Sequence, residues 1–390
     1  MDRSGPAKPL SFKDERVLSA LGTELLSASA QANVTHIQAL IRGNAPAWFQ
    51  DPTTGWGALH FAVAGDGRGK ARKKECIVRC VELLLEAGTP WNAVDELGNS
   101  PGDVALSLND VECYELIRDA GLRSEFALHA IQSKTSLTGL RAEDSTAAGS
   151  TDEFLKSKLV YRTDDNGQEI VVVDIDGEEV GVMMGWERSI MEATVRALCP
   201  PQSKSESKGA TVLNVGFGLG IIDTLFQSLT PPPSRHVIIE PHPDVLAHMR
   251  STGWFDKPGV EIFQGKWQDF INPERIGELI GEEEGFDVIY TDTFSEGYND
   301  LYQFFENLGD LMVGQDSRFS FFNGLGATHA TFYDVYTKLA ALHLEDMALT
   351  TTWEDIDVHS AAEGAGAWDE TRKYFSLPLY RMPICRPLQG

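Results

Sequence analysis

The stretch TVLNVGFGLGIID, residues Thr211 to Asp223, decides the fold. The apolar residues Val212, Leu213 and Val215 are followed at once by three glycines at alternate positions, Gly216, Gly218 and Gly220. Glycine lets the backbone turn tightly and approach a ligand where a Cβ would collide. The pattern therefore predicts a buried strand, a glycine-rich turn and a helix, as at nucleotide sites in α/β folds.

A second predicted strand strengthens this interpretation. It covers His236 to Ile239 and ends in Glu240, about two dozen residues past Gly216, where such folds place the carboxylate that binds a ribose diol. The glycines alone are a weak signal and more often mark an ordinary strand-to-helix turn. The strand, the glycines, the helix, the second strand and its terminal acid together favour a cofactor site.

Strands and helices alternate through the rest of the chain, which is typical of a parallel sheet covered by helices on both faces. The glycine spacing and a seventh strand favour the adenosyl pocket of a methyltransferase over a six-stranded dinucleotide fold. The expected fold is therefore α/β, with a seven-strand doubly wound class I methyltransferase sheet. Its predicted strands cover 212–215, 236–239, 260–264, 286–290, 318–322, 348–353 and 373–379.

Hairpins are predicted just before this sheet. Their strands cover 159–162, 169–174 and 179–184, with turns at DDNG and Asp176-Gly177, and a helix follows over 186–198. We therefore expect a methyltransferase domain over 153–390, with hairpins and helix in 153–199 and the sheet core in 210–390. Ser, Thr and Ala dominate the polar stretch before it, so 124–152 is predicted to be a linker.

The N-terminal region carries a repeat. Two helical patches lie within residues 11–50, and Leu83, Leu84, Ala87 and Gly88 then recur as Leu116, Ile117, Ala120 and Gly121, 33 residues later. This is the period of ankyrin repeats. Residues 1–123 are therefore predicted to be a small helical ankyrin-repeat-like domain, interrupted by a basic insertion over 65–74. Such a stack is either a scaffold for the rest of the chain or a binding surface for a protein partner.

Composition excludes some classes of function. The formal charge of −25 makes nucleic acid an unsuitable direct ligand and favours a basic partner, although acidity also serves solubility alone. No apolar run reaches the roughly 18 residues of a membrane span. The five cysteines form no repeated CxxC pair, so we expect free thiols and buried packing for Cys76 and Cys80 instead of a metal site.

Different residues are expected to bind different parts of the cofactor. Phe217 to Ile222 would wrap the amino-acid end of the cofactor and Glu240 would bind its ribose. Trp267 and Gln268 would meet the adenine, although Trp267 is equally compatible with core packing. Asp292 follows the fourth strand at the sheet edge where ligands bind, and would face the transferred methyl group. The alternative role for Asp292 is a helix cap.

Five motifs in the same order give the chain a family resemblance. GWERSIME, LNVGFGLGIID, IIEPHPDV, GKWQDF and DVIYTDTFSEGY resemble guanidinoacetate methyltransferases. Together with the N-terminal repeats, they are similar to the fungal type IV protein arginine methyltransferases, which methylate the internal (δ) guanidino nitrogen of arginine in a large-subunit ribosomal protein. The resemblance runs from about Phe154 to the C-terminus. Gly-Leu-Gly replaces Gly-Met-Ala in the loop, and Phe294 replaces a tyrosine.

The resemblance implies a set of site residues and partners. Glu187 and Asp292 would form the catalytic acidic pair that grips the guanidinium. No metal is expected. The substrate would be a basic protein, with the repeats as a possible partner site, and the enzyme would occur in cytoplasm and nucleus. The cofactor would be S-adenosyl-L-methionine, its product S-adenosyl-L-homocysteine, and its binding residues Tyr161, Met191, Phe217, Gly218, Leu219, Gly220, Ile221, Ile222, Glu240, Pro241, His242, Trp267, Gln268 and Asp292.

Physical chemistry agrees with an acidic pair. A guanidinium is a planar fork that two carboxylates can hold, and it is a poor nucleophile while protonated. Two acids could orient one nitrogen toward a methyl donor and accept its proton. The sequence thus predicts an S-adenosylmethionine-dependent protein arginine δ-N-methyltransferase. The alternatives are a small-molecule guanidino methyltransferase and an ankyrin-based adaptor with an inert methyltransferase fold.

Overall fold

The computed structural model describes most of the chain and divides into two compact units. The first unit is Met1–Ile131 with His329–Val335, and the second is Gln132–Thr328 with Tyr336–Gly390. The described residues are 12–65, 73–132, 146–164, 167–200, 208–282, 284–358 and 371–388.

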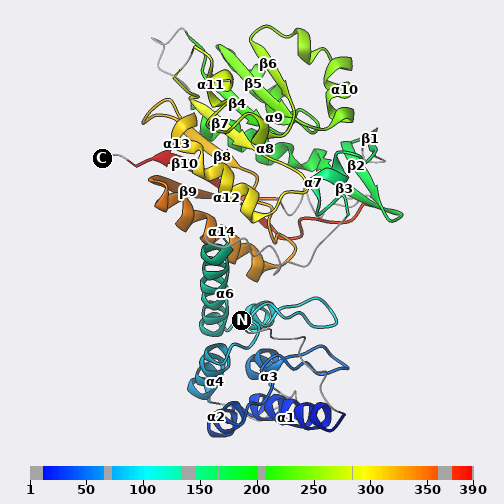
Figure 1. Ribbon diagram of the computed structural model, residues 1–390, viewed down its shortest axis with the longest axis vertical. Helices are drawn as coiled ribbons and strands as arrows, with labels where there is room; N and C mark the ends of the chain where they lie inside the picture. Colours follow the sequence, from blue (N-terminus) through cyan, green and yellow to red (C-terminus); the bar gives the residue numbers. More distant parts are fainter. Residues whose placement is uncertain are drawn as a thin grey trace, which may run out of the picture. The chain divides into compact units, whose positions relative to one another are not determined.

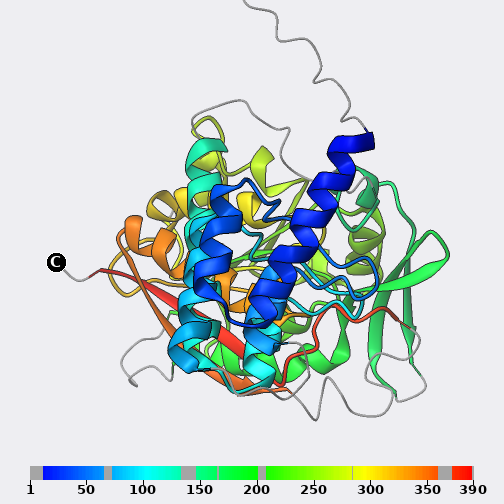
Figure 2. The same ribbon diagram turned by 90° about the horizontal axis from the view of Figure 1, so that it is seen from below.

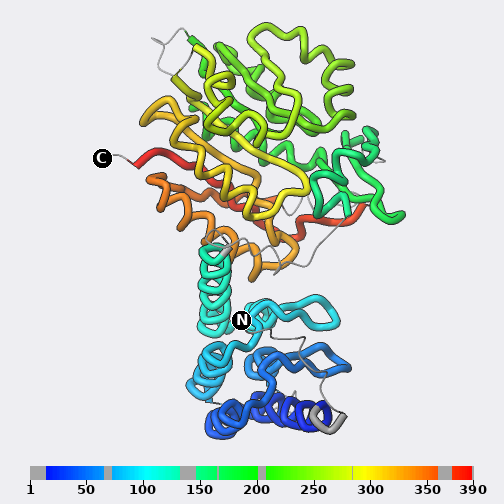
Figure 3. The backbone as a smooth tube through the Cα atoms, in the orientation of Figure 1, coloured from blue at the N-terminus to red at the C-terminus, as the bar shows by residue number. Residues whose placement is uncertain are grey.

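The second unit is built on a seven-stranded sheet (Figures 1 and 3). Its strand order is β6-β5-β4-β7-β8-β10-β9, in which the first five strands are parallel and β10 is antiparallel to both of its neighbours. This confirms the predicted doubly wound class I methyltransferase sheet. The strands are β4 (Thr211–Val215), β5 (Arg235–Glu240), β6 (Val260–Gln264), β7 (Val288–Thr291), β8 (Arg318–Phe321), β9 (Leu349–Asp357) and β10 (Leu379–Pro387).

The last predicted strand is placed wrongly. The expected range is 373–379, whereas β10 begins only at Leu379 and pairs with β9 along its whole length. Pro378 has no amide hydrogen to give to a ladder, and the side chains of Tyr380, Met382 and Ile384 provide the buried face. Residues 371–378 are consequently free to take an irregular path.

A three-stranded antiparallel sheet precedes the large sheet in sequence. It contains β1 (Leu159–Thr163), β2 (Glu169–Ile175) and β3 (Glu178–Met184), as the hairpin signals predict. Asp176 and Gly177 both have positive φ, at 56° and 87°, which suits the twist of a two-residue hairpin turn. The helices of this unit are α7 (Thr151–Phe154), α8 (Arg188–Leu198), α9 (Ile221–Gln227), α10 (Pro243–Ser251), α11 (Ile276–Ile280), α12 (Tyr298–Glu306), α13 (Leu308–Leu311) and most of α14 (Ala330–Asp346).

The first unit consists of helices that lie side by side (Figures 1 and 2). They are α1 (Phe12–Ala30), α2 (Val34–Arg42), α3 (Ala58–Ala64), α4 (Lys74–Glu86), α5 (Pro101–Ser107) and α6 (Val111–Gln132). Their apolar faces share one core, which includes Leu25, Leu59, Leu84 and Ile117. This confirms the small helical ankyrin-repeat-like domain.

The buried His60 side chain connects successive repeats of the first unit by hydrogen bonds. Its Nδ1 accepts from the Gly57 amide at 3.0 Å, and its Nε2 donates to the Asn99 carbonyl at 3.1 Å. Because both ring nitrogens are used and the side chain is fully buried, His60 fixes the start of α3 against the turn before α5. That turn is held by Asp95, whose Oδ1 accepts from the amides of Leu97 and Asn99.

The boundary between the two units differs from the prediction. Helix α6 continues to Gln132, so the first nine residues of the predicted linker 124–152 are helical. Glu125, Ala127, Leu128 and Ala130 are good helix formers, and this propensity outweighs the polar composition of the stretch. Residues 133–145 of that linker, and most of the predicted basic insertion at 65–74, lie outside the described residues.

The first unit also includes a short segment from late in the sequence. Thr331 donates from its amide and hydroxyl to Asp103 Oδ1 at 3.2 and 3.0 Å, and the Phe332 ring lies 5.5 Å from that of Trp91. Val335 is fully buried in the core of the unit. The sequence boundary at residue 123 therefore does not separate all residues of the two units.

Candidate active site

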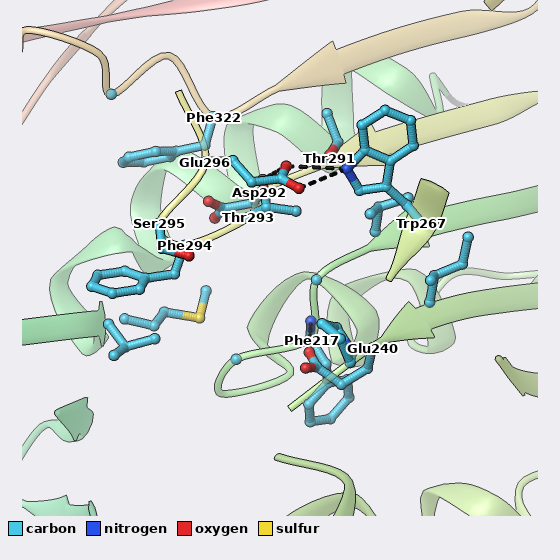
Figure 4. A pocket seen from close by; sticks show the side chains of 18 of the residues that line it. Phe217, Glu240, Trp267, Thr291, Asp292, Thr293, Phe294, Ser295, Glu296 and Phe322 are labelled. Carbon is cyan, nitrogen blue, oxygen red and sulfur yellow. Dashed lines mark hydrogen bonds between the residues drawn. The ribbon is translucent and has the colours of Figure 1, made fainter. Parts of the chain in front are cut away.

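A cavity of about 250 Å³ opens at the carboxyl ends of the parallel strands in the second unit (Figure 4). This is the edge at which open α/β sheets bind their ligands. Within the described part of the chain, no helix has the length and apolar character needed to cross a membrane. Several of its polar and aromatic residues lie at the end of β5 or in the loops after β4, β6, β7 and β8, namely Phe217, Glu240, Trp267, Asp292, Glu296 and Phe322.

The glycine loop after β4 packs directly on the loop after β7. Gly216 has φ +91°, and a Cβ there would lie 2.0 Å from the Asp292 carbonyl oxygen. Only glycine allows this approach. The Asp292 amide in turn donates to the Val215 carbonyl at 2.9 Å, so the strand and the acidic loop are fixed to one another.

Glu240 is the last residue of β5, and it lines the cavity (Figure 4). Its Oε2 accepts from the Phe217 amide at 2.9 Å and its Oε1 from the His242 amide at 2.7 Å. Burial raises the pKa of Glu240 to about 7. Each carboxylate oxygen keeps a second lone pair, so Glu240 can accept hydroxyl groups from a ribose while it holds the glycine loop.

A polar cluster forms the far wall. The Trp267 indole donates to the two carboxylate oxygens of Glu296 at 2.9 and 3.1 Å (Figure 4). The side-chain amide of Gln268 donates to Glu296 Oε1 at 3.0 Å. Thr293 donates its hydroxyl to Glu296 Oε2 at 2.6 Å. Glu296 is absent from the predicted site residues, because its local pattern does not distinguish it from a solvated acid at a helix start.

Asp292 and Glu187 line the same cavity, although they are 105 positions apart in the chain. Glu187 is buried, and its Oε1 accepts from the Met184 amide at 2.9 Å and from the Tyr374 hydroxyl. The Asp292 carboxylate accepts no hydrogen bond from the described residues. Burial raises the pKa of both acids, and the charge of Asp292 raises that of Glu187 further.

The alternative role of Asp292 as a helix cap is wrong. Helix α12 begins at Tyr298 with Gly297 as its N-cap, and the Gly297 amide donates to the Asp300 carboxylate at 2.8 Å. Asp300 therefore satisfies the helix start. The carboxylate of Asp292 is left at the cavity wall, where its lone pairs are available to a cationic ligand.

Most of the predicted cofactor residues line the cavity, and some do not. Those that do are Met191, Phe217, Gly218, Ile222, Glu240, Pro241, Trp267 and Asp292. Leu219, Gly220 and Ile221 do not: Gly220, at φ +68°, starts α9, and Ile221 is buried in its first turn. The Leu219 amide lies against the Met183 sulfur at 3.2 Å.

Three further predicted residues lie outside the cavity lining and bond to residues around it. The Tyr161 hydroxyl donates to the Gly218 carbonyl at 3.1 Å, and its ring stacks on His248. His242 caps α10 through Nδ1 and donates from Nε2 to the Phe154 carbonyl at 3.0 Å. Gln268 reaches Glu296 only. None of the three side chains lines the cavity: Tyr161 and His242 are bonded to neighbouring segments, and Gln268 is bonded to Glu296.

The residues present fit S-adenosyl-L-methionine. Gly218 lines the cavity without a side chain, as close approach to a ligand requires. Glu240 offers acceptors for a ribose, and the Trp267 ring is held by Glu296 beside an apolar wall of Phe304. An adenosyl group needs this combination of an acidic, a glycine-rich and an aromatic surface.

Curated proteins similar to this chain are fungal. The chain is 41% identical to "Protein arginine N-methyltransferase 2" of Cryptococcus neoformans var. neoformans serotype D, over 95% of this chain and 96% of the relative. The protein of the same description from Emericella nidulans is 32% identical over 93% and 96%, and that from Saccharomyces cerevisiae is 34% identical over 80% and 79%. No family model matches the chain.

Solved structures resemble separate parts of the chain. Aeropyrum pernix fibrillarin with natively bound S-adenosyl-L-methionine is 14% identical at a TM-score of 0.34, over 58% of this chain and 93% of that one. An ankyrin repeat domain from Acinetobacter baumannii AYE is 28% identical at a TM-score of 0.22, over 25% and 46%. Because its identity to the Cryptococcus and Emericella proteins extends over nearly their full length, the chain belongs to the family of fungal protein arginine N-methyltransferase 2 proteins.

Proposed function

We propose that this protein transfers a methyl group from S-adenosyl-L-methionine to the internal (δ) guanidino nitrogen of arginine in a basic protein, with a large-subunit ribosomal protein as the substrate. Membership of the arginine methyltransferase family supports arginine as the acceptor. The formal charge of −25 supports a basic substrate. The observation that carries the proposal is the pair of carboxylates on one cavity, the buried Glu187 and the partly buried Asp292.

Two carboxylates suit a guanidinium better than any neutral acceptor. Burying two like charges together is costly, and the raised pKa values of both acids reflect that cost. A planar cation between them offsets the repulsion and satisfies the unused lone pairs of Asp292. Substrate binding and ionisation of the pair therefore reinforce each other.

The same pair can direct the reaction. S-adenosyl-L-methionine, when bound, supplies an electrophilic sulfonium methyl group. Glu187 and Asp292 hold the two terminal nitrogens, which leaves the internal nitrogen for methylation and polarises the guanidinium so that its conjugation to that nitrogen weakens. An acid of raised pKa is also a suited acceptor for the proton that leaves the nitrogen.

The test compares three acceptors with labelled S-adenosyl-L-methionine: a large-subunit ribosomal protein fraction, a synthetic peptide with one arginine, and free guanidinoacetate. Hydrolysis and mass spectrometry of the labelled protein should give δ-N-methylarginine. Label in terminal-nitrogen methylarginine would refute the δ position, and label only in guanidinoacetate would favour a small-molecule methyltransferase. Transfer to none of the three would favour an adaptor with an inert fold.

Cellular location and partner binding extend the proposal. We propose that the protein occurs in both cytoplasm and nucleus, since ribosomal proteins are made in one and assembled in the other, and that the first unit binds a protein partner. Fluorescence microscopy of the tagged full chain tests the first point, and exclusion from either compartment would refute it. Binding of a partner by the first unit is tested by co-purification of proteins with the full chain and with a variant altered on the exposed loops of residues 12–132. Equal recovery of the partner with both chains would refute it.

A further inference from the structure

Tyr374 is hydrogen-bonded to one member of the acidic pair. It lies in the irregular segment between residues 371 and 378 and lines the cavity together with Glu187 and Asp292. Its hydroxyl donates to Glu187 Oε1, the same oxygen that accepts from the Met184 amide. Two donors on one oxygen leave Oε2 as the acceptor of Glu187 that faces a ligand.

The segment that carries Tyr374 is anchored on both sides. The Arg372 amide donates to the Glu179 carbonyl in β3 at 2.9 Å, and the Ser376 amide donates to the Ala327 carbonyl after β8 at 3.0 Å. Phe375 is fully buried, with its ring 5.9 Å from that of Trp186. Tyr374 is therefore held in place by its neighbours and does not depend on Glu187 for its position.

The Tyr374 ring is also closely packed. A Cβ on Gly181 would lie 3.2 Å from its Cε1 atom, so the ring rests on the backbone of β3. A ring that cannot move presents its hydroxyl at a fixed point. The hydrogen bond consequently selects one orientation of the Glu187 carboxylate.

We propose that Tyr374 is a positioning residue of the methyl-acceptor site, which turns the free oxygen of Glu187 toward the arginine guanidinium. This inference rests on the proposed function and deepens it. The titratable groups that face Glu187 are Asp292 and Tyr290 from β7 and its loop, and Tyr374 itself. Of these, Tyr374 donates a hydrogen bond to the charged form of Glu187, which favours ionisation.

Tyr374→Phe removes the hydroxyl and keeps the ring. Because the hydrogen bond acts on bound substrate and transition state alike, we expect KM for a single-arginine peptide to rise about 10-fold, with kcat within about threefold of wild type. Loss of the donor raises the pKa of Glu187. The acidic limb of the kcat/KM profile should therefore move to higher pH by about one pH unit.

Tyr298→Phe is the matched control. Tyr298 is a buried tyrosine of the same unit whose hydroxyl bonds His343 Nδ1 at 2.8 Å, and it does not line the cavity. It should keep the wild-type KM and pH profile. Affinity for S-adenosyl-L-homocysteine should stay within about twofold in both variants, which separates a local effect from a loss of folding.

A double-mutant cycle decides whether Tyr374 acts through Glu187. In the Glu187→Gln background, Tyr374→Phe should change the peptide affinity, measured with S-adenosyl-L-homocysteine bound, by less than about twofold. A further 10-fold loss, or a Tyr374→Phe enzyme with wild-type KM and pH profile, would overturn the inference and leave the proposed function intact. A wild-type enzyme that methylates no arginine would overturn the proposed function, and the inference with it.

Discussion

Gly216→Ala should damage both stability and catalysis, because this glycine lies against the backbone of the acidic loop. The new Cβ would be 2.0 Å from the Asp292 carbonyl oxygen, and ordinary contact begins at about 3.4 Å, so the backbone must shift by about 1.4 Å. A positive φ of +91° adds about 1 kcal/mol for a non-glycine residue. Relief of the clash adds about 2 kcal/mol. We expect a loss of about 3 kcal/mol in the free energy of unfolding.

The matched control is Gly253→Ala. Gly253 also has positive φ, at +76°, but a Cβ there meets no atom within 4 Å. This variant should lose only the conformational cost of about 1 kcal/mol and keep full activity.

Urea unfolding followed by tryptophan fluorescence gives the stabilities, and methyl transfer to an arginine peptide gives the activities. Displacing Asp292 by about 1 Å should lower kcat by about 100-fold in Gly216→Ala. If the two variants lost equal stability and both kept wild-type kcat, the close approach of the two loops would have no role in placing Asp292.

Three further substitutions test other parts of the structure. Asp292→Asn should lower transfer by about 1000-fold while affinity for S-adenosyl-L-homocysteine stays within a few fold, and unchanged turnover would exclude Asp292 from the chemistry. Glu240 binds its proton more tightly in the folded state, with a pKa of about 7 against 4.5, so its contribution to stability is full below pH 4.5 and is lost as pH rises through about 7. Glu240→Gln should remove this loss, and a melting temperature with unaltered pH dependence would contradict it. His60→Ala should destabilise the first unit by about 3 kcal/mol in thermal unfolding, because the buried Gly57 amide loses its partner, the Asn99 carbonyl loses one of its two donors and the buried ring leaves a void. A shift below about 1 kcal/mol would show that water replaces the ring.

Local sequence patterns determined the fold to a large extent. Alternating apolar runs predicted six of the seven strands near their observed positions, and the 33-residue repeat predicted the paired helices of the first unit. Backbone conformation follows from residues that are neighbours in sequence. The misplaced final strand followed the run 373–379, in which Tyr374 lines the cavity and Phe375 is buried instead of entering a ladder.

The sequence by itself also determined which loops carry the site, because the carboxyl ends of parallel strands meet at one edge. Glu240, Trp267 and Asp292 were found in this way. Only the tertiary structure decided which side chains reach the cavity. His242 caps a helix and does not line the cavity, whereas Glu296 and Tyr374, to which the sequence patterns assigned no role, line it. The physical reason is that strand geometry is local, whereas the direction of a side chain depends on hydrogen bonds and packing between residues far apart in the chain.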